Sequence, residues 1–275
     1  MSTLKAFAPA KVNLTLHVTG QRADGYHLLD SLVVFADVGD RVTVMPAEKM
    51  SLEITGPMAD GVPTDGSNLV MKAADLFGVP VRMLLSKHLP AAAGIGGGSS
   101  DAAATVLAIA DLLDEKRLPD VSVLGADVRV CLLRQAARMS GIGEVVEPVA
   151  GMPALHAVLV NPGVDVPTPV VFKALAQKKN APMPKRLPRW KDAAALTQWL
   201  ATQRNDLEVP AIARAPAIAE VMEALHGCDG VTLTRMSGSG ATCFGLFPTA
   251  QAAAQAAERL RQAQPTWWVQ ATRLS

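Results

Sequence analysis

The chain opens with a strict alternation of hydrophobic and polar residues in KVNLTLHV, residues 11–18. Such alternation predicts a half-buried β-strand, because successive side chains of a strand point to opposite faces. The polar face of this strand carries Lys11, Asn13, Thr15 and His17. We therefore expect Lys11 and Asn13 to point in the same direction.

The pattern then predicts a sheet followed by helices. A turn at Asp24-Gly25 precedes strand-like sequence at SLVVFADV (31–38) and DRVTVMP (40–46). Residues 69–77 read as a short helix and VRMLLSK (81–87) as a strand. The segment DAAATVLAIADLL (101–113) is rich in alanine and leucine and stops before Pro119, which predicts a longer helix. A glycine-rich segment separates this helix from the preceding strand.

The second half of the chain alternates strands and helices. GMPALHAVLVNPG (151–163) predicts a turn and a strand, and residues 173–191 are basic and dotted with proline, as in surface loops. Asn205 and Glu208 have the spacing of a capping box before the apolar periodicity of residues 209–227. The strands VTLTRM and ATCFGLF flank SGSG, and a helix over 249–264 leads to a final strand. This order predicts an α+β fold, with one domain over 1–150 and another over 151–275.

Composition narrows the class of protein. The chain has 275 residues, of which 49% are hydrophobic, and a mean hydropathy of +0.23, enough for a sizeable core. Its 26 basic residues nearly balance 25 acidic ones, giving a net charge of +1. This balance gives no electrostatic footprint for nucleic acid or for an anionic membrane. Any anion must therefore be held by a local site.

The three cysteines, Cys131, Cys228 and Cys243, are odd in number and have no CxxC spacing. They predict neither a disulfide framework nor a zinc site and fit a reducing compartment. The sequence shows no signal peptide and no apolar run of the ~18 residues that a membrane span requires. A cytoplasmic protein is the expectation.

The segment PAAAGIGGGSS, residues 90–100, has four glycines within five residues directly before the strongest helix. A helix that starts at Ser99, Ser100 or Asp101 exposes unpaired backbone N–H groups and a partial positive charge, which together favour a phosphate group. The segment is not a Walker A loop, because no lysine follows the last glycine, and Ser99 interrupts GxGxxG. The alternative is a tight turn with Ser99 or Ser100 as the N-cap.

Other candidates are weaker when taken alone. The second glycine segment, Ser237, Gly238, Ser239 and Gly240, is either a hairpin turn or a second group of backbone N–H donors. Lys11 fits a solvated strand lysine, and Asp127 fits an N-cap. Tyr26 is the chain's single tyrosine and, beside His27 at a turn, could stack on a ring.

Seven motifs in order, PAKVNLTLHV, RADGYH, LPAAAGIGGGSSDAA, LGADV, PTPVVF, NDLE and MSGSGATCFGLF, resemble the signatures of the GHMP small-molecule kinases. They run from Ala8 to Phe247. RADGYH and PTPVVF resemble the branch that phosphorylates the 2-hydroxyl of a cytidine diphosphate-linked methylerythritol in non-mevalonate isoprenoid precursor synthesis. Arg129 stands where this branch usually has proline.

The resemblance implies an N-terminal mixed-sheet domain and a C-terminal ferredoxin-like α/β sandwich. It implies that Lys11 and Asp127 flank the reacting hydroxyl, Asp127 as the base and Lys11 as its electrostatic partner. It further implies a set of ATP-binding residues (Pro90, Ala91, Ala92, Ala93, Gly94, Ile95, Gly96, Gly97, Gly98, Ser99 and Ser100) and a set of substrate-binding residues (Asn13, Tyr26, His27, Thr168 and Phe172).

Phosphoryl transfer mainly requires positioning and charge stabilisation, so a backbone cradle, a cation and a base suffice together with Mg²⁺. We therefore expect ATP and Mg²⁺ as cofactors, with the magnesium ligands unassigned, and a small-molecule substrate for a monomer or homodimer. Two alternatives stay open. One is a GHMP kinase for homoserine or mevalonate, and the other is a nucleotide-binding homologue without catalysis.

Overall fold

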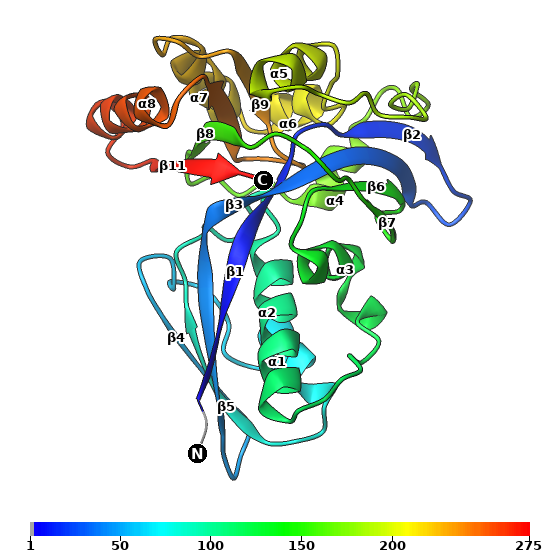
Figure 1. Ribbon diagram of the computed structural model, residues 1–275, viewed down its shortest axis with the longest axis vertical. Coiled ribbons are helices and arrows are strands. Elements are labelled where there is room, and N and C mark those ends of the chain that lie inside the picture. The colour runs from blue at the N-terminus through cyan, green and yellow to red at the C-terminus, as the bar shows by residue number, and fades with distance from the viewer. Residues whose placement is uncertain (1–2) are drawn as a thin grey trace. The chain divides into compact units, whose positions relative to one another are not determined.

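The computed structural model describes residues 3–275 (Figure 1). The chain forms two compact units that are interleaved along the sequence. The first unit comprises the chain up to Lys11, Val38–Ala91 and Gly96–Arg134, and the second comprises Val12–Asp37, Ala92–Ile95 and Gln135–Ser275. These units do not test the expected domain boundary near residue 150, which stays a prediction.

The first unit is a mixed sheet with helices packed on it. Its strands are β1 (Leu4–Asn13) as far as Lys11, the later part of β3 (His27–Pro46), β4 (Ser51–Thr55) and β5 (Val81–Ser86). β5 pairs antiparallel with β3 and parallel with β4. The helices are α1 (Leu69–Asp75), α2 (Gly97–Leu112), a 3₁₀ turn (Ser122–Leu124) and α3 (Ala126–Leu133). Ala104, Ala108 and Ile109 of α2 share one core cluster with Val42, Val44 and Met83 of the sheet, because the alanine-rich face lets helix and sheet approach closely.

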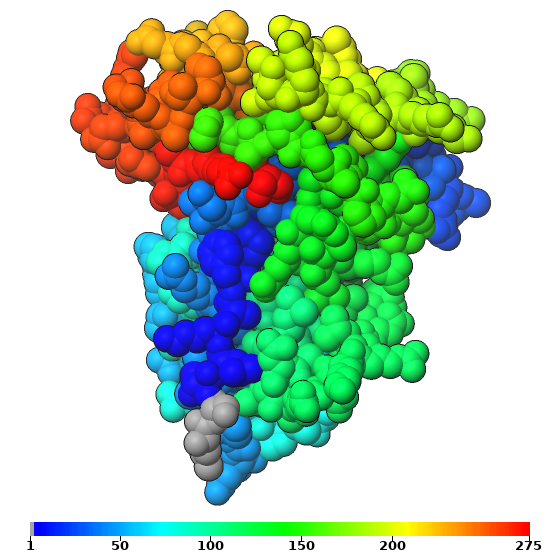
Figure 2. Space-filling view, viewed as in Figure 1, coloured from blue at the N-terminus to red at the C-terminus, as the bar shows by residue number. Residues whose placement is uncertain are grey.

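The second unit contains a four-stranded antiparallel sheet in the order β11-β8-β10-β9. Its strands are β8 (Leu155–Asn161), β9 (Leu233–Met236), β10 (Cys243–Phe247) and β11 (Trp268–Leu274). The helices of this unit are α4 (Thr168–Lys173), α5 (Ala193–Ala201), α6 (Glu208–Arg214), α7 (Ala217–His226) and α8 (Ala250–Ala263). This strand order, with α8 between β10 and β11, gives the expected ferredoxin-like sandwich. Figure 2 shows β11, in red, beside the orange residues of α8.

A smaller antiparallel group completes the second unit. β2 (His17–Gln21) and β6 (Ala137–Gly141) both pair with the first part of β3, and β7 (Val145–Pro148) pairs with β6. The β2–β3 hairpin turns at Asp24-Gly25, as expected, and Gly25 has the positive φ of 91° that such a turn requires. The hairpin carries Tyr26 and His27 into the site described below.

Three expectations about local structure are wrong. KVNLTLHV is not a half-buried strand, because β1 ends at Asn13, β2 starts at His17, and the polar residues of the expected solvent face are buried as well. α2 starts at Gly97 with Gly96 as its N-cap, so neither Ser99 nor Ser100 caps it. The single helix expected over 209–227 is two helices, α6 and α7, because a residue before proline avoids helical backbone and Ala215 precedes Pro216.

Candidate active site

Lys11 and Asp127 form an ion pair in the first unit. Lys11 Nζ donates to Asp127 Oδ2 at 2.8 Å, and the two side chains are 6% and 38% exposed. Lys11 is therefore not the solvated strand lysine that its pattern alone would give. Asp127 is the second residue of α3, whose N-cap is Gly125, so the N-cap interpretation of Asp127 is wrong. Its carboxylate lies in the first turn, where the helix dipole favours negative charge.

The start of α2 lies beside this ion pair. A Cβ built on Gly96 would lie 3.3 Å from both Cβ and Cε of Lys11, and Gly96 has a φ of 63°. Glycine at this position therefore lets the backbone turn into the helix directly over the lysine side chain. Because Gly96 offers no side-chain cap, the first N–H groups of α2 have no side-chain acceptor at the N-cap.

The expected phosphate loop divides between the two units. Pro90 and Ala91, together with the residues from Gly96 through Gly97, Gly98 and Ser99 to Ser100, belong to the first unit. The intervening residues, Ala92, Ala93, Gly94 and Ile95, belong to the second. Ala92 and Gly94 both have positive φ, of 48° and 72°. The backbone thus turns twice before α2 begins, which places the helix N-terminus at the end of a tight loop.

Within the second unit, the two glycine segments pack backbone to backbone. Ser237 Oγ donates to the carbonyl of Gly94 at 2.9 Å and accepts from the backbone N–H of Asn13 at 3.0 Å. A Cβ on Gly94 would lie 2.5 Å from the carbonyl oxygen of Ser237, and one on Gly238 would lie 2.8 Å from that of Gly94. Only glycine permits this approach. The second segment is therefore more than a hairpin turn between β9 and β10.

The same segment reaches two of the expected substrate residues. Ser239 Oγ and Thr168 Oγ1 are 2.7 Å apart in a hydrogen bond. Asn13 Nδ2 donates to Ser31 Oγ at 2.7 Å, while Asn13 Oδ1 is buried and has no hydrogen-bond partner among residues 3–275. A buried acceptor without a partner is costly, which makes Asn13 Oδ1 a candidate contact for a ligand.

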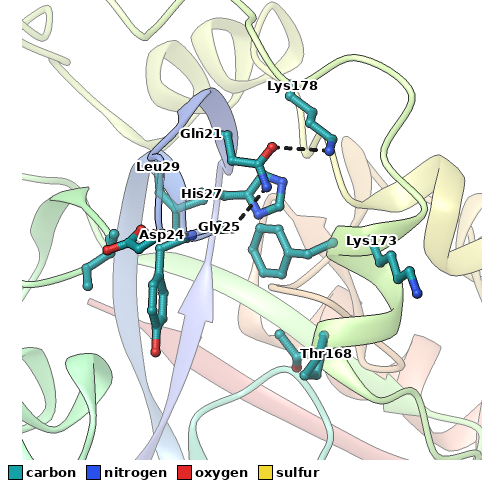
Figure 3. A pocket seen from close by; sticks show the side chains of 12 residues that line it. Gln21, Asp24, Gly25, His27, Leu29, Thr168, Lys173 and Lys178 are labelled. Carbon is teal, nitrogen blue, oxygen red and sulfur yellow. Dashed lines mark hydrogen bonds between the residues drawn. The ribbon is translucent and has the colours of Figure 1, made fainter.

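A pocket of about 580 Å³ lies in the second unit and contains the remaining expected substrate residues (Figure 3). Tyr26 and His27 line it from the β2–β3 hairpin, and Thr168 and Phe172 line it from α4. The His27 and Phe172 rings stack with centroids 4.9 Å apart and planes inclined by 26°. Tyr26 is 61% exposed, so its ring is available at the pocket edge. The pocket therefore offers aromatic faces to a flat ligand.

Two lysines give the pocket wall a positive character. Lys173 and Lys178 both line it, and Lys178 Nζ donates to Gln21 Oε1 at 3.2 Å (Figure 3). Gln21 Nε2 in turn donates to the carbonyl of Gly25 at 3.0 Å, which braces the hairpin turn. Burial and the nearby Lys178 lower the pKa of His27, so its ring is neutral near pH 7.

Asn205 is a functional candidate that the sequence reasoning assigned to a different role. Its Nδ2 donates to the carbonyls of Met236 and Gly238, both at 2.8 Å, and Glu208 Oε2 accepts from the N–H of Met236 at 3.0 Å. The motif NDLE thus holds the second glycine segment instead of forming a capping box. Gln21 and Lys178 were missed altogether, because a lone glutamine and one lysine within a basic loop carry no pattern of their own.

Two segments of the chain match one enzyme family. Residues 68–140 match the GHMP kinase N-terminal domain, and residues 172–266 match the GHMP kinase C-terminal region. A 4-diphosphocytidyl-2-C-methyl-D-erythritol kinase from Cereibacter sphaeroides (strain ATCC 17025 / ATH 2.4.3) is 58% identical over 98% of this chain and 99% of its own length. The chain belongs to the GHMP kinase family. An enzyme of the same name from Dinoroseobacter shibae is also 58% identical, over 98% of this chain and 94% of its own.

Solved structures agree with this membership of the GHMP kinases. The crystal structure of a 4-(cytidine 5'-diphospho)-2C-methyl-D-erythritol kinase is 35% identical, covers 99% of both chains and gives a TM-score of 0.80. A homoserine kinase from Cytophaga hutchinsonii gives a TM-score of 0.64 at 19% identity, over 99% of this chain and 95% of its own. The second likeness establishes the fold alone.

Proposed function

We propose that this GHMP kinase transfers the γ-phosphoryl group of ATP to the 2-hydroxyl of 4-diphosphocytidyl-2-C-methyl-D-erythritol, in non-mevalonate isoprenoid precursor synthesis. The observation that carries the chemistry is the Lys11–Asp127 ion pair beside the start of α2, where no side chain caps the helix. The choice of acceptor is supported by the 58% identical relatives of that name and by the aromatic pocket of the second unit.

Asp127 is the proposed base. Its side chain is partly exposed, so an acceptor hydroxyl could reach the carboxylate, and the Lys11 ammonium is paired with it at 2.8 Å. A carboxylate of this kind accepts the hydroxyl proton as the oxygen attacks phosphorus. Lys11 then balances the charge that develops on the transferring group.

The glycine loop is the proposed phosphate site. The backbone N–H groups at the start of α2, from Gly97 onward, lie at the positive end of a 16-residue helix and have no capping side chain. Among residues 3–275, no group of three or more His, Cys, Asp or Glu side chains is placed to hold a metal ion. This arrangement fits Mg²⁺ that arrives on the phosphates of ATP, because Mg²⁺ often takes most of its ligands from phosphate and water.

The pocket around His27 and Phe172 is the proposed cytidine site. Tyr26 would cover the exposed face of the base, and Lys178 would face the diphosphate, since both line the pocket. Asn13 Oδ1, buried and without a partner among the described residues, would accept from a substrate hydroxyl. Thr168, bonded to Ser239, would place the hydroxyl-bearing chain.

An ADP-release assay with three acceptors tests this function. We expect turnover with the cytidine-linked methylerythritol and none above background with homoserine or mevalonate. Turnover with homoserine or mevalonate alone would contradict the proposed acceptor. Tight ATP binding with no ADP release for any acceptor would instead support a homologue that lost catalysis, which the presence of both Lys11 and Asp127 argues against.

Three broader expectations remain proposals. No helix among the described residues is long and apolar enough to cross a membrane. The three cysteines are all buried and free. The cytoplasmic location, the monomeric or dimeric state and the absence of nucleic-acid partners stay predictions that fractionation and size-exclusion chromatography would test.

A further inference from the structure

Three buried charged side chains of the first unit have no part in the proposed reaction. Lys87 Nζ donates to a carboxylate oxygen of Asp40 and, at 2.8 Å, to Asp101 Oδ2. All three side chains are at most 4% exposed. Removing one cation and two carboxylates from water costs free energy that their mutual attraction does not always offset. The cluster is therefore not explained by stability alone.

This cluster contacts both ends of the glycine loop. Asp40 Oδ1 accepts from the backbone N–H groups of His88 and Leu89, directly before the loop starts at Pro90. Asp101 is the fifth residue of α2, at the other end of the loop. Lys87 joins the two carboxylates, so one ammonium group ties the entry of the loop to its exit.

The cluster also lies directly against the helix start. A Cβ built on Gly97, the first residue of α2, would have Lys87 Nζ as its nearest neighbour, at 3.6 Å. Ser100 Oγ and Asp101 Oδ1 are both buried and lack hydrogen-bond partners within residues 3–275. Ser100 Oγ therefore provides no hydrogen bond that would hold the first turn of α2 beside this cluster.

We propose that Asp40, Lys87 and Asp101 form an anchoring cluster that positions the glycine loop for nucleotide phosphates, and that protonation of Asp101 tunes nucleotide affinity. The inference rests on the proposed ATP site. Asp101 is a positioning residue, because it acts through Lys87 and the first turn of α2 without touching the reacting atoms.

The charge of the cluster determines whether protonation of Asp101 strengthens or weakens nucleotide binding. Burial raises the pKa of Asp101 to about 7, although the Lys87 ammonium opposes the rise. Burial alone would lower the pKa of Lys87, but attraction to Asp101 and Asp40 outweighs it and raises that pKa, so Lys87 stays cationic. The cluster is therefore neutral when Asp101 is protonated and carries one negative charge when Asp101 is ionised.

The thiol of α3 that interacts with Asp101 does not titrate near pH 7. Cys131 of α3 lies within electrostatic reach of Asp101, Asp127 and Lys11, and burial raises the pKa of its thiol far above neutrality. α1 shares a core cluster with α2 through Val70 and Ala74.

The charged residues of α1 also add no charge next to the cluster. Lys72 and Asp75 of this helix are both exposed, on the side away from its buried face. Asp101 is therefore the group of this cluster that changes charge around pH 7.

Nucleotide binding and protonation are then linked. A polyphosphate at the start of α2 repels an ionised Asp101 and favours its protonated form, so binding takes up a proton. Nucleotide affinity should fall as the pH rises through about 7. A shift of one pKa unit on binding corresponds to about a tenfold change in Kd.

Titration calorimetry on the full chain tests this linkage with two probes, a non-hydrolysable ATP analogue and CDP. Asp101→Asn keeps the size and neutral charge of protonated Asp101. We expect the variant and the wild type to bind the analogue nearly equally at pH 6, and the variant to bind about fivefold more tightly at pH 8 for a shift of one pKa unit on binding. Protonation of the analogue itself changes both affinities equally, so it does not alter the ratio of the two Kd values at a given pH. Glu53→Gln, in the exposed pair with Arg82, is the matched control and should follow the wild type.

CDP separates positioning from folding, because its proposed pocket belongs to the second unit. CDP affinity should be the same in the wild type and Asp101→Asn at both pH values. The proposal is overturned if the variant and the wild type show the same pH dependence for the ATP analogue, or if the variant weakens both probes together. Failure of the wild type to bind the analogue at all would instead refute the proposed ATP site.

Discussion

Close packing of the two glycine segments can be tested by adding one methyl group. In Gly94→Ala, the new Cβ would lie 2.5 Å from the Ser237 carbonyl oxygen, 2.8 Å from that of Gly240 and 2.9 Å from its nitrogen. All three neighbours are backbone atoms, so a side-chain rotation cannot relieve the contacts. The two segments must separate, or the loop must change its conformation.

The expected loss of stability has two parts. A left-handed φ, 72° at Gly94, costs an L-residue about 1–2 kcal/mol. Separation would also break two hydrogen bonds, from Ser237 Oγ to the Gly94 carbonyl and from the Thr242 N–H to the Ala93 carbonyl, each with a net value of about 1 kcal/mol. Gly94→Ala should therefore lower the free energy of unfolding by about 3–4 kcal/mol.

Gly230→Ala is the matched control for backbone strain. Gly230 has a similar φ of 77°, but a Cβ there would meet nothing within 4 Å. It should cost only about 1–2 kcal/mol, and the change in unfolded-state entropy is the same for both substitutions. Urea denaturation of both variants therefore isolates a difference of about 2 kcal/mol. Equal unfolding free energies in the two variants would refute the close packing of the glycine segments.

Two further substitutions probe the second unit. Tyr26→Ala should raise KM for the cytidine substrate about tenfold or more and leave kcat nearly unchanged, because base stacking away from the reacting hydroxyl contributes about 1–3 kcal/mol to both the ground state and the transition state. An unchanged KM in steady-state assays would show that Tyr26 does not contact the substrate. Asn205→Ala leaves the Met236 and Gly238 carbonyls without their buried donor and should lower the free energy of unfolding by about 2–3 kcal/mol. A loss below about 0.5 kcal/mol, which is the usual effect of a neutral surface substitution, would show that these hydrogen bonds contribute little.

Much of the fold could be predicted from periodicity and turn residues. The helix over 69–77, the strands around 81–87 and 155–161, and the C-terminal order of strands and helices all follow from local patterns. Local patterns failed at KVNLTLHV, because alternation indicates which side chains share a face but not whether the second face is covered. Lys11, Asn13, Thr15 and His17 are covered by parts of the chain that are distant in sequence.

The site could be predicted only in part, for a related reason. Glycine density drew attention to both segments, and backbone does approach backbone closely at Gly94 and Gly238. The phosphate-binding role of these segments stays a prediction. The first residue of a helix is harder to predict from sequence. Serine is normally preferred over glycine as an N-cap, yet Gly96 is the N-cap of α2. The Asp40–Lys87–Asp101 cluster has no sequence signature, since Lys87 lies 47 residues from one partner and 14 from the other.

The most direct test of the central claim is the turnover number of Asp127→Asn. Asparagine keeps the size of the side chain and can still accept from Lys11, but it cannot take the hydroxyl proton. Unchanged affinities for CDP and for the ATP analogue would show that the variant is folded and that both sites are intact. With binding preserved, kcat should fall by about 10²–10⁴-fold, the usual contribution of a general base. A variant that binds both ligands and keeps more than about a tenth of the wild-type kcat would contradict the assignment of Asp127 as the base.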